Sequence, residues 1–135
     1  MGGAPACVLV GRGETYVGAQ GLTYGAGITE ATTGARGLSM TVAELPPGAR
    51  ARAHLHRRIE SGGYVIEGTV ETLWGERLEH AVVAREGEFV YIPPDVPHLV
   101  RNPSADRPAR ALVAHTAPDD QQGIELRPDL DELVR

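Results

Sequence analysis

The chain has 135 residues and a formal net charge of −5 with the histidines neutral. A chain of this length forms one domain with a single core, and its acidic balance argues against a nucleic-acid partner, which favours a clustered basic surface. No apolar run approaches the ~20 residues of a membrane-spanning helix, so no membrane association is expected.

The N-terminus lacks the basic segment and long apolar run that are typical of a signal peptide. Cys7 is the single cysteine, so no internal disulfide can form and a cytoplasmic location is expected. Seventeen glycines and ten prolines punctuate the chain, and long helical periodicity is nearly absent. Many short strands between Gly/Pro turns predict an all-β sandwich or barrel.

The single domain divides into three parts by composition. Residues 1–37 are rich in Gly and Thr and predict an N-terminal arm with edge strands, including a short strand at Cys7–Val10. The arm has little apolar content, so we expect it to pack along the barrel edge or across a partner subunit, in a homodimer. Residues 38–116 form the barrel, and residues 117–135 form a polar tail in which Asp129–Val134 is a helical turn or mobile.

The barrel segment is expected to contain short strands. Leu38–Leu45 and Ala49–His56 alternate in character and are separated by a Pro-Pro-Gly turn, and Arg57–Gly63 is expected to be a further turn. The remaining predicted strands are Tyr64–Glu67, Thr69–Trp74, Leu78–Val83, Phe89–Ile92, His98–Arg101 and Ala109–His115.

Three histidines point to a metal site. His54 and His56 are two residues apart on a predicted strand, so their side chains share one face. Glu60 follows within a few residues, and His98 comes directly after a Pro-rich turn. Imidazoles and a carboxylate suit a borderline divalent metal.

Two motifs carry a resemblance to a known family. The first reads Gly, five residues, His-x-His, three or four residues, Glu, six residues, Gly. It is matched by Gly48, His54, His56, Glu60 and Gly68, except that seven residues separate Glu60 from Gly68.

The second motif reads Gly, five residues, Pro-x-Gly, two residues, His, three residues, Asn. Gly87, Pro93, His98 and Asn102 match its spacing, while Asp95 replaces the central Gly, a mild change because Asp tolerates turn conformations. With both motifs, the chain resembles a single-domain cupin of the small bacterial type.

The resemblance implies a double-stranded β-helix or jelly-roll barrel with little helix. It also implies that His54, His56, Glu60 and His98 ligate one divalent transition metal, which would be Zn, Fe, Mn, Ni or Co. Four ligands on an octahedral ion leave two positions for water or substrate, as a catalytic site requires.

The extra residue before Gly68 leaves two alternatives for the carboxylate. Either a one-residue bulge lets Glu60 point inward, or the site has three histidines, with His80 or His115 joining. Ser61 satisfies both spacings of the first motif, but a serine hydroxyl is a poor ligand.

The functional hypothesis is a metal-dependent enzyme that acts on a small oxygenated organic molecule. The metal would act as a Lewis acid or oxygen activator, in a polyketide cyclase, isomerase or lyase, with Glu60 and Tyr64 as catalytic residues. Tyr64 is included because it shares the parity of Glu60 along a regular strand. The alternatives are an Fe- or Ni-dependent dioxygenase that cleaves a diketone or phenolic substrate, and a non-catalytic small-molecule binding module.

Overall fold

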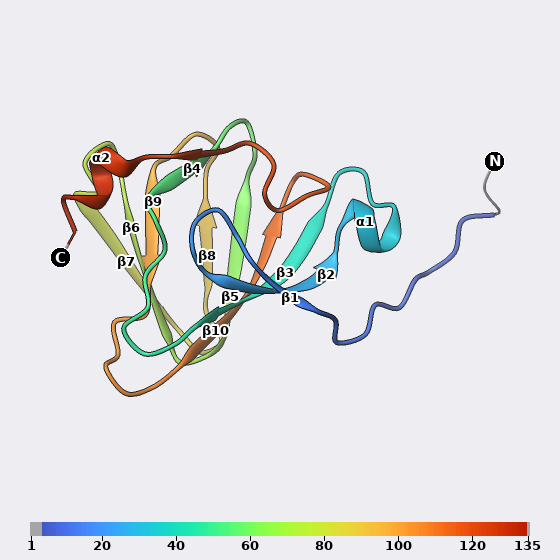
Figure 1. Cartoon of the computed structure of the whole chain (residues 1–135), viewed down its shortest axis with the longest axis horizontal. Coiled ribbons are helices and arrows are strands. Elements are labelled where there is room, and N and C mark those ends of the chain that lie inside the picture. Colours follow the sequence, from blue (N-terminus) through green and yellow to red (C-terminus); the bar gives the residue numbers. More distant parts are fainter. Residues whose placement is uncertain (1–3, 135) are drawn as a thin grey trace.

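Two antiparallel sheets face each other and enclose the interior of the molecule (Figure 1). This computed structural model describes residues 4–134. The first sheet has the order β1-β2-β3-β10-β5-β8 and consists of β1 (Thr15–Val17), β2 (Thr23–Ile28), β3 (Ser39–Leu45), β5 (Ser61–Glu67), β8 (Phe89–Ile92) and β10 (Ala109–His115).

The second sheet has the order β11-β4-β9-β6-β7. It consists of β4 (His54–His56), β6 (Thr69–Trp74), β7 (His80–Arg85), β9 (His98–Arg101) and β11 (Ile124–Leu126). Two short helices, α1 (Glu30–Thr33) and α2 (Pro128–Asp131), complete the chain. The prediction of an all-β jelly roll with little helix is confirmed. Neither helix in residues 4–134 is long and apolar enough to cross a membrane.

Four strands have the predicted bounds, but the predicted strand Ala49–His56 is wrong over most of its length. Only its last three residues form β4, because the preceding backbone donors bond to different partners. The amide of Ala51 donates to Val100 O, whereas the amide of Arg52 donates to Gln20 O on another segment. The segment therefore crosses between neighbours and enters the second sheet only at His54.

The predicted turn Arg57–Gly63 is also wrong at its end, because β5 already begins at Ser61. Gly62 and Gly63 pair with β10 on one side and β8 on the other. Pairing along both edges holds these glycines in a strand despite their low strand propensity. The strand predicted at Leu78–Val83 lies at His80–Arg85, and Cys7–Val10 is not a strand.

The interior between the sheets is filled by small and branched side chains. Along β3, Ser39, Thr41, Ala43 and Leu45 are buried, whereas the intervening residues are less so. Cross-strand neighbours complete this core, which includes Leu22, Tyr24, Ala51, Val65, Val70, Ala109 and Ala111.

The C-terminal segment pairs with the edge of β4 and packs on hydrophobic residues beside it. Its strand β11 pairs with β4, and Leu130 of α2 packs in a cluster with Ala53 and Leu99. The carboxylate of Asp131 accepts a hydrogen bond of 2.7 Å from the amide of Ala53. The tail was predicted to be polar, with a helical turn or a mobile segment at Asp129–Val134. It instead forms β11 and α2 and fixes the edge of the strand that carries two of the histidines.

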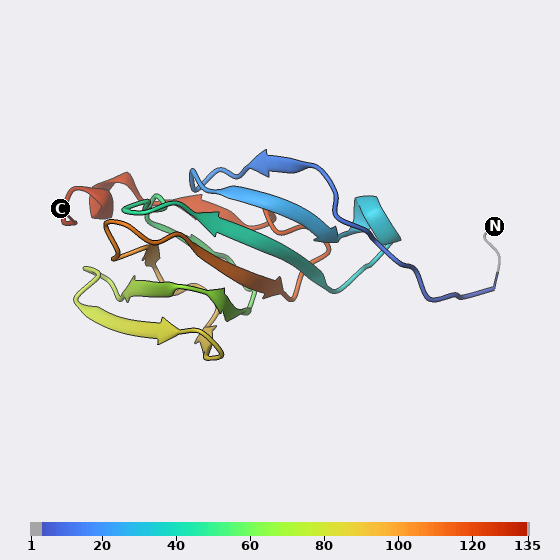
Figure 2. The same cartoon turned by 90° about the horizontal axis from the view of Figure 1, so that it is seen from below.

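Residues 4–14, which precede β1, extend away from the barrel as an arm without strands (Figures 1 and 2). Leu9 on this arm is 94% exposed. The arm leads into β1 and β2, which add to the edge of the first sheet at β3.

Gly68, the last residue of the first motif, is expected to be sensitive to substitution. It has φ +77°, and a Cβ there would lie 2.5 Å from Pro108 O. Gly87 has a similar φ of +86° but open space around its Cβ position. Substitution of Gly87 therefore measures the cost of the left-handed backbone conformation without a steric clash. Gly87→Ala should cost about 1–2 kcal/mol from left-handed strain, and Gly68→Ala about 3 kcal/mol or more because of the added clash. Urea denaturation of both variants measures the difference, and equal losses would contradict it.

Candidate metal centre

Three buried histidines on β4 and β9 of the second sheet converge on the interior of the barrel. His54 and His56 share one face of β4, and His98 begins β9 directly opposite His54. Their candidate ligand atoms all lie within 4.8 Å of one another, and each residue is 4% exposed or less. The His54 and His98 ring centroids are 4.3 Å apart. The structure thus brings together three of the four predicted ligand residues.

Backbone hydrogen bonds fix the tautomers of two of these rings. His54 Nδ1 lies 2.7 Å from Arg52 O, and His98 Nδ1 lies 2.9 Å from Val96 O. A carbonyl oxygen only accepts, so Nδ1 carries the proton in both rings and Nε2 keeps its lone pair. This outer hydrogen bond is the arrangement that orients histidine ligands in metal sites.

The third ring has an unsatisfied nitrogen. His56 Nδ1 is buried and makes no hydrogen bond of standard geometry among residues 4–134, although the backbone of Gln122 lies close enough to the ring to raise its pKa. A buried polar atom without a partner is costly, and a metal ion or a ligand would satisfy it. The donor set therefore fits a divalent transition metal.

Burial keeps these imidazoles neutral. It lowers the pKa of His98 to about 4, and it lowers the pKa of His54 well below the ordinary value and that of His56 in the same direction. Only the neutral ring can ligate a metal, so at neutral pH the three donors need not lose protons before binding.

Ser61 and His115 form a further pair of polar residues beside the three histidines. They face each other across β5 and β10, and Ser61 Oγ lies 2.8 Å from His115 Nδ1. Both are buried, and the ring centroid of His115 is 4.6 Å from that of His56. Ser61 occupies the position that both motif spacings assign to the carboxylate, and this spacing was the signal that could have identified it.

Glu60 lies outside this cluster. Because adjacent strand residues point to opposite faces, the inward direction of Ser61 turns Glu60 outward. The Glu60 side chain is exposed and accepts a hydrogen bond of 2.7 Å from Tyr91 Oη. Tyr64 borders the cavity, but its ring packs on Phe89, which is 78% exposed. Glu60 and Tyr64 were predicted to point to the same side of the strand. They do so, but this side is the outer face of the strand.

His80, the other candidate for joining the site, is not part of the cluster. Its ring stacks on Trp74 at a centroid distance of 4.3 Å, and the residue is exposed at the start of β7. Of the two histidines left open by the sequence, the structure brings only His115 to the cluster.

The histidines open into a cavity of about 90 Å³ with mostly apolar walls. Among the described residues that line it, none is Asp, Glu, Lys or Arg. The walls consist largely of aliphatic side chains, such as Leu45, Val65, Val70, Val100, Ala111 and Val113.

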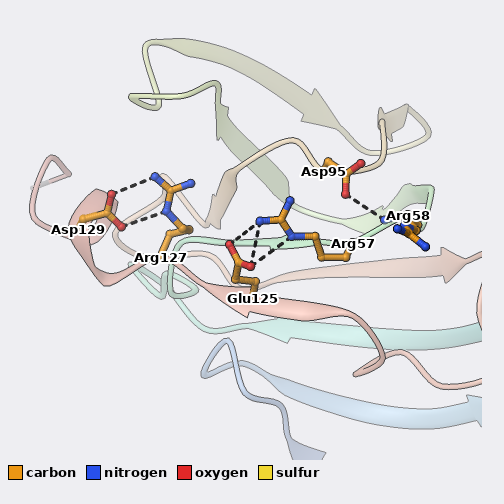
Figure 3. A network of polar contacts seen from close by, with 6 residues as sticks. All are labelled: Arg57, Arg58, Asp95, Glu125, Arg127 and Asp129. Carbon is orange, nitrogen blue, oxygen red and sulfur yellow. Dashed lines mark hydrogen bonds and ion pairs between the residues drawn. The ribbon is translucent and has the colours of Figure 1, made fainter.

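Asp95 fastens the loop of one motif to that of the other. Its amide donates to His56 O at 3.0 Å. Its carboxylate accepts a hydrogen bond of 3.0 Å from the amide of Arg58 (Figure 3). Asp95 has φ +65°, so it adopts the conformation for which the motif uses Gly while adding a hydrogen bond that Gly cannot make. Next to it, Arg57 pairs with Glu125 of β11 at 2.9 Å. The Asp95 contacts hold the turn after β4 against the loop before His98, and the ion pair holds the same turn against β11.

Comparison with known proteins agrees with this architecture. The family model of the cupin domain matches residues 41–115. Protein SchB from Streptomyces halstedii is 37% identical over 103 residues, which are 76% of this chain and 67% of SchB. The chain therefore belongs to the cupin family.

Solved structures of enzymes share the fold. Oxalate oxidase in complex with the substrate analogue glycolate matches with a TM-score of 0.67 and 24% identity, over 82% of this chain and 57% of that one. Oxalate decarboxylase from Bacillus subtilis matches with a TM-score of 0.70 and 16% identity, over 90% of this chain and 33% of that one. At these identities the likeness shows the fold alone, and this chain spans little more than half of the first protein and a third of the second.

Proposed function

We propose that this cupin is a metal-dependent enzyme that acts on a small oxygenated organic molecule. The observation that carries the proposal is the cluster of His54, His56 and His98, whose rings are buried, neutral and oriented toward one another in a cavity. One Zn, Fe, Mn, Ni or Co ion per chain fits three imidazole donors, since nitrogen ligands suit these metals better than Mg or Ca.

The three-histidine alternative is favoured over a set that includes Glu60. The Glu60 side chain is held on the outer face of β5 by Tyr91 and would need a local shift to reach the cluster. The same contact makes a catalytic role for Glu60 depend on that shift, whereas Tyr64 already borders the cavity with its ring packed on Phe89. Three protein ligands also leave open positions for a substrate, as a catalytic site requires.

The chain's own residues define what a substrate meets. The aliphatic walls exclude water, and His115, held through Nδ1 by Ser61, lines the cavity beside His56. When bound, the metal would supply Lewis-acid polarisation of a substrate carbonyl or hydroxyl oxygen. These features support a cyclase, isomerase or lyase reaction in which a polarised oxygen is the reactive centre.

Metal analysis of protein purified without chelators tests the proposal. We expect about one transition metal ion per chain, and no bound metal from any of the five candidates would refute it. Iron or nickel together with oxygen uptake on a diketone would select the dioxygenase alternative. Ligand affinity without turnover by metal-loaded protein would select the non-catalytic binding module.

We further propose that the chain forms a homodimer through the free edges of β7 and β8. Each strand is the last in its sheet, and an apolar groove there is lined by Trp74, Val82, Phe89 and Tyr91. Phe89, Tyr91 and Trp74 are 78%, 60% and 40% exposed. At roughly 200 Å² per aromatic residue they offer roughly 350 Å², nearly half of the ~800 Å² that each partner buries in a standard interface.

Phe89→Glu is expected to convert the dimer to a monomer, because it places a charge at the centre of this apolar face. Analytical ultracentrifugation measures the mass, and Leu133→Glu, at a residue 45% exposed on the C-terminal segment, is the matched control that should remain dimeric. If replacing Val8 and Leu9 of the arm with serine dissociates the dimer instead, arm exchange holds the subunits together.

A free, exposed Cys7 fits the cytoplasmic location that we propose for this dimer.

A further inference from the structure

We propose that Asp120 acts on the metal centre from outside the ligand set, as a positioning residue whose buried negative charge offsets the charge of the bound ion. The inference rests on the proposed metal-dependent function and adds to it a residue that neither sequence motif contains. Asp120 lies in the loop that joins β10 to β11, the strand that pairs with β4.

Asp120 is a buried carboxylate without a cationic partner. It is 4% exposed and is the one buried Asp, Glu or Arg among residues 4–134. Its Oδ2 atom accepts hydrogen bonds from Tyr16 Oη and, at 3.0 Å, from Gln121 Nε2, and both donors are neutral. It takes part in none of the ion pairs of the described chain. Burying a carboxylate among neutral donors alone costs folding free energy, so a nearby positive charge would stabilise it.

Two paths of contact connect Asp120 to the walls of the histidine cavity. Gln121, which bonds to Asp120, also donates to Gln20 Oε1 at 3.3 Å, and Gln20 lines the cavity. Tyr16, the other donor, stacks on Tyr24 at a centroid distance of 5.7 Å, and Tyr24 also lines the cavity. A single side chain therefore separates Asp120 from a lining residue along each path.

The loop that carries Asp120 also leads to the histidine cluster. Its continuation, Ile124, pairs with His56 in β4. Burial lowers the pKa of His56, whereas the backbone of Gln122 and then the charge of Asp120 act in the opposite direction. A cation held by His56 is attracted by the same negative charge.

The charge of a bound ion makes this attraction important. Three neutral imidazoles leave a divalent ion with its full charge, and the described residues that line the cavity include no Asp or Glu. In a buried site of low dielectric constant, Asp120 is the buried carboxylate that can offset this charge. Conversely, the ion reduces the cost of burying Asp120, so metal binding and the folded loop stabilise each other.

Asp120→Asn removes the charge while keeping an oxygen that can accept from Tyr16 and Gln121. We expect zinc affinity to fall by about 10–100-fold, the range for residues just outside the ligands of a metal. Isothermal titration measures the change, and circular dichroism establishes that the variant is folded. If Asp120→Asn does not fold, Asp120→Ser, which is also neutral, takes its place.

Asp119→Asn is the matched control. It removes the same charge from the neighbouring residue, which is exposed, so water screens its carboxylate from the cavity. The carboxylate of Asp119 accepts a hydrogen bond of 2.9 Å from the amide of Gln121, and an asparagine oxygen can accept the same bond. Zinc affinity should therefore stay within about threefold of the parent.

Silver(I) separates an effect of charge from a distortion of the site. The ion carries half the charge of zinc, so the neutral variant should bind it only about 3–10-fold more weakly than the parent, the square root of the loss for zinc. A distorted site would weaken both ions alike. Cys7 is exposed and its soft thiolate also binds silver, so these titrations use proteins with Cys7→Ser.

Parent-like zinc affinity in the folded neutral variant would overturn the inference while leaving the metal-dependent function standing. An equal loss in Asp119→Asn would also overturn it, because net charge would then explain the effect. Equal losses for silver and zinc would overturn it as well, because the shape of the site would then explain them. Failure of the parent to bind zinc or any other candidate metal would overturn the proposed function and this inference with it.

Discussion

Replacing His98 with alanine is expected to lower the affinity for a divalent transition metal by about 100-fold or more. Even residues that only orient a ligand contribute 10–100-fold to metal affinity, and a lost ligand costs more. His98 is 3% exposed and pairs with His54 across β4 and β9, so its loss removes one of the three converging donors. Isothermal titration with zinc measures the change.

His80→Ala is the matched control. This histidine is exposed and is not one of the three clustered histidines, so its loss should leave zinc affinity within about threefold. Circular dichroism of both proteins separates lost ligation from lost structure. Parent-like zinc affinity in a folded His98→Ala variant would show that the metal, if any, is held elsewhere.

Acid is expected to destabilise the metal-free protein strongly between pH 7 and pH 5. Burial lowers the pKa of His98 to about 4 and that of His115 to about 3, from about 6.5 in the unfolded chain. Between pH 6.5 and the folded pKa values, these histidines are therefore protonated in the unfolded state but neutral in the folded state. The stabilisation is complete above pH 6.5 and is lost as the pH falls toward the folded values.

The two residues together should cost about 4 kcal/mol over this range, a large part of the 5–15 kcal/mol that stabilises a typical domain. The lowered pKa values of His54 and His56 add to the loss in the same direction. Urea denaturation in the presence of a chelator at pH 7, 6 and 5 measures it. His98→Asn should reduce the dependence of the unfolding free energy on pH by the contribution of His98. A free energy of unfolding that does not decrease as the pH is lowered would contradict the prediction.

Much of the site could be predicted because it depends on local geometry. Alternation along a strand puts His54 and His56 on one face whatever the rest of the chain does. A Pro-rich turn excludes helix before His98 and leads into the next strand. Two motifs at their characteristic separation then indicated a barrel that brings these segments together, and the structure pairs His54 with His98.

The carboxylate position depended on information that spacing alone does not carry. Glu60 and Ser61 are neighbours, so a register difference of one residue decides which of them points inward. That register is set by pairing with β10, where His115 lies opposite Ser61 and bonds to it. The bond joins residues 54 positions apart, which no local pattern in the sequence indicates.

By itself, the sequence determined the all-β class, the strands around the second motif and the three histidines, because periodicity and turn chemistry act over a few residues. Only the tertiary structure decided that the polar C-terminal segment pairs with β4 and that Ser61 with His115, rather than Glu60, faces the histidines. Both outcomes arise from pairing between distant strands, whose register is selected by the burial of whole faces rather than by neighbours along the chain.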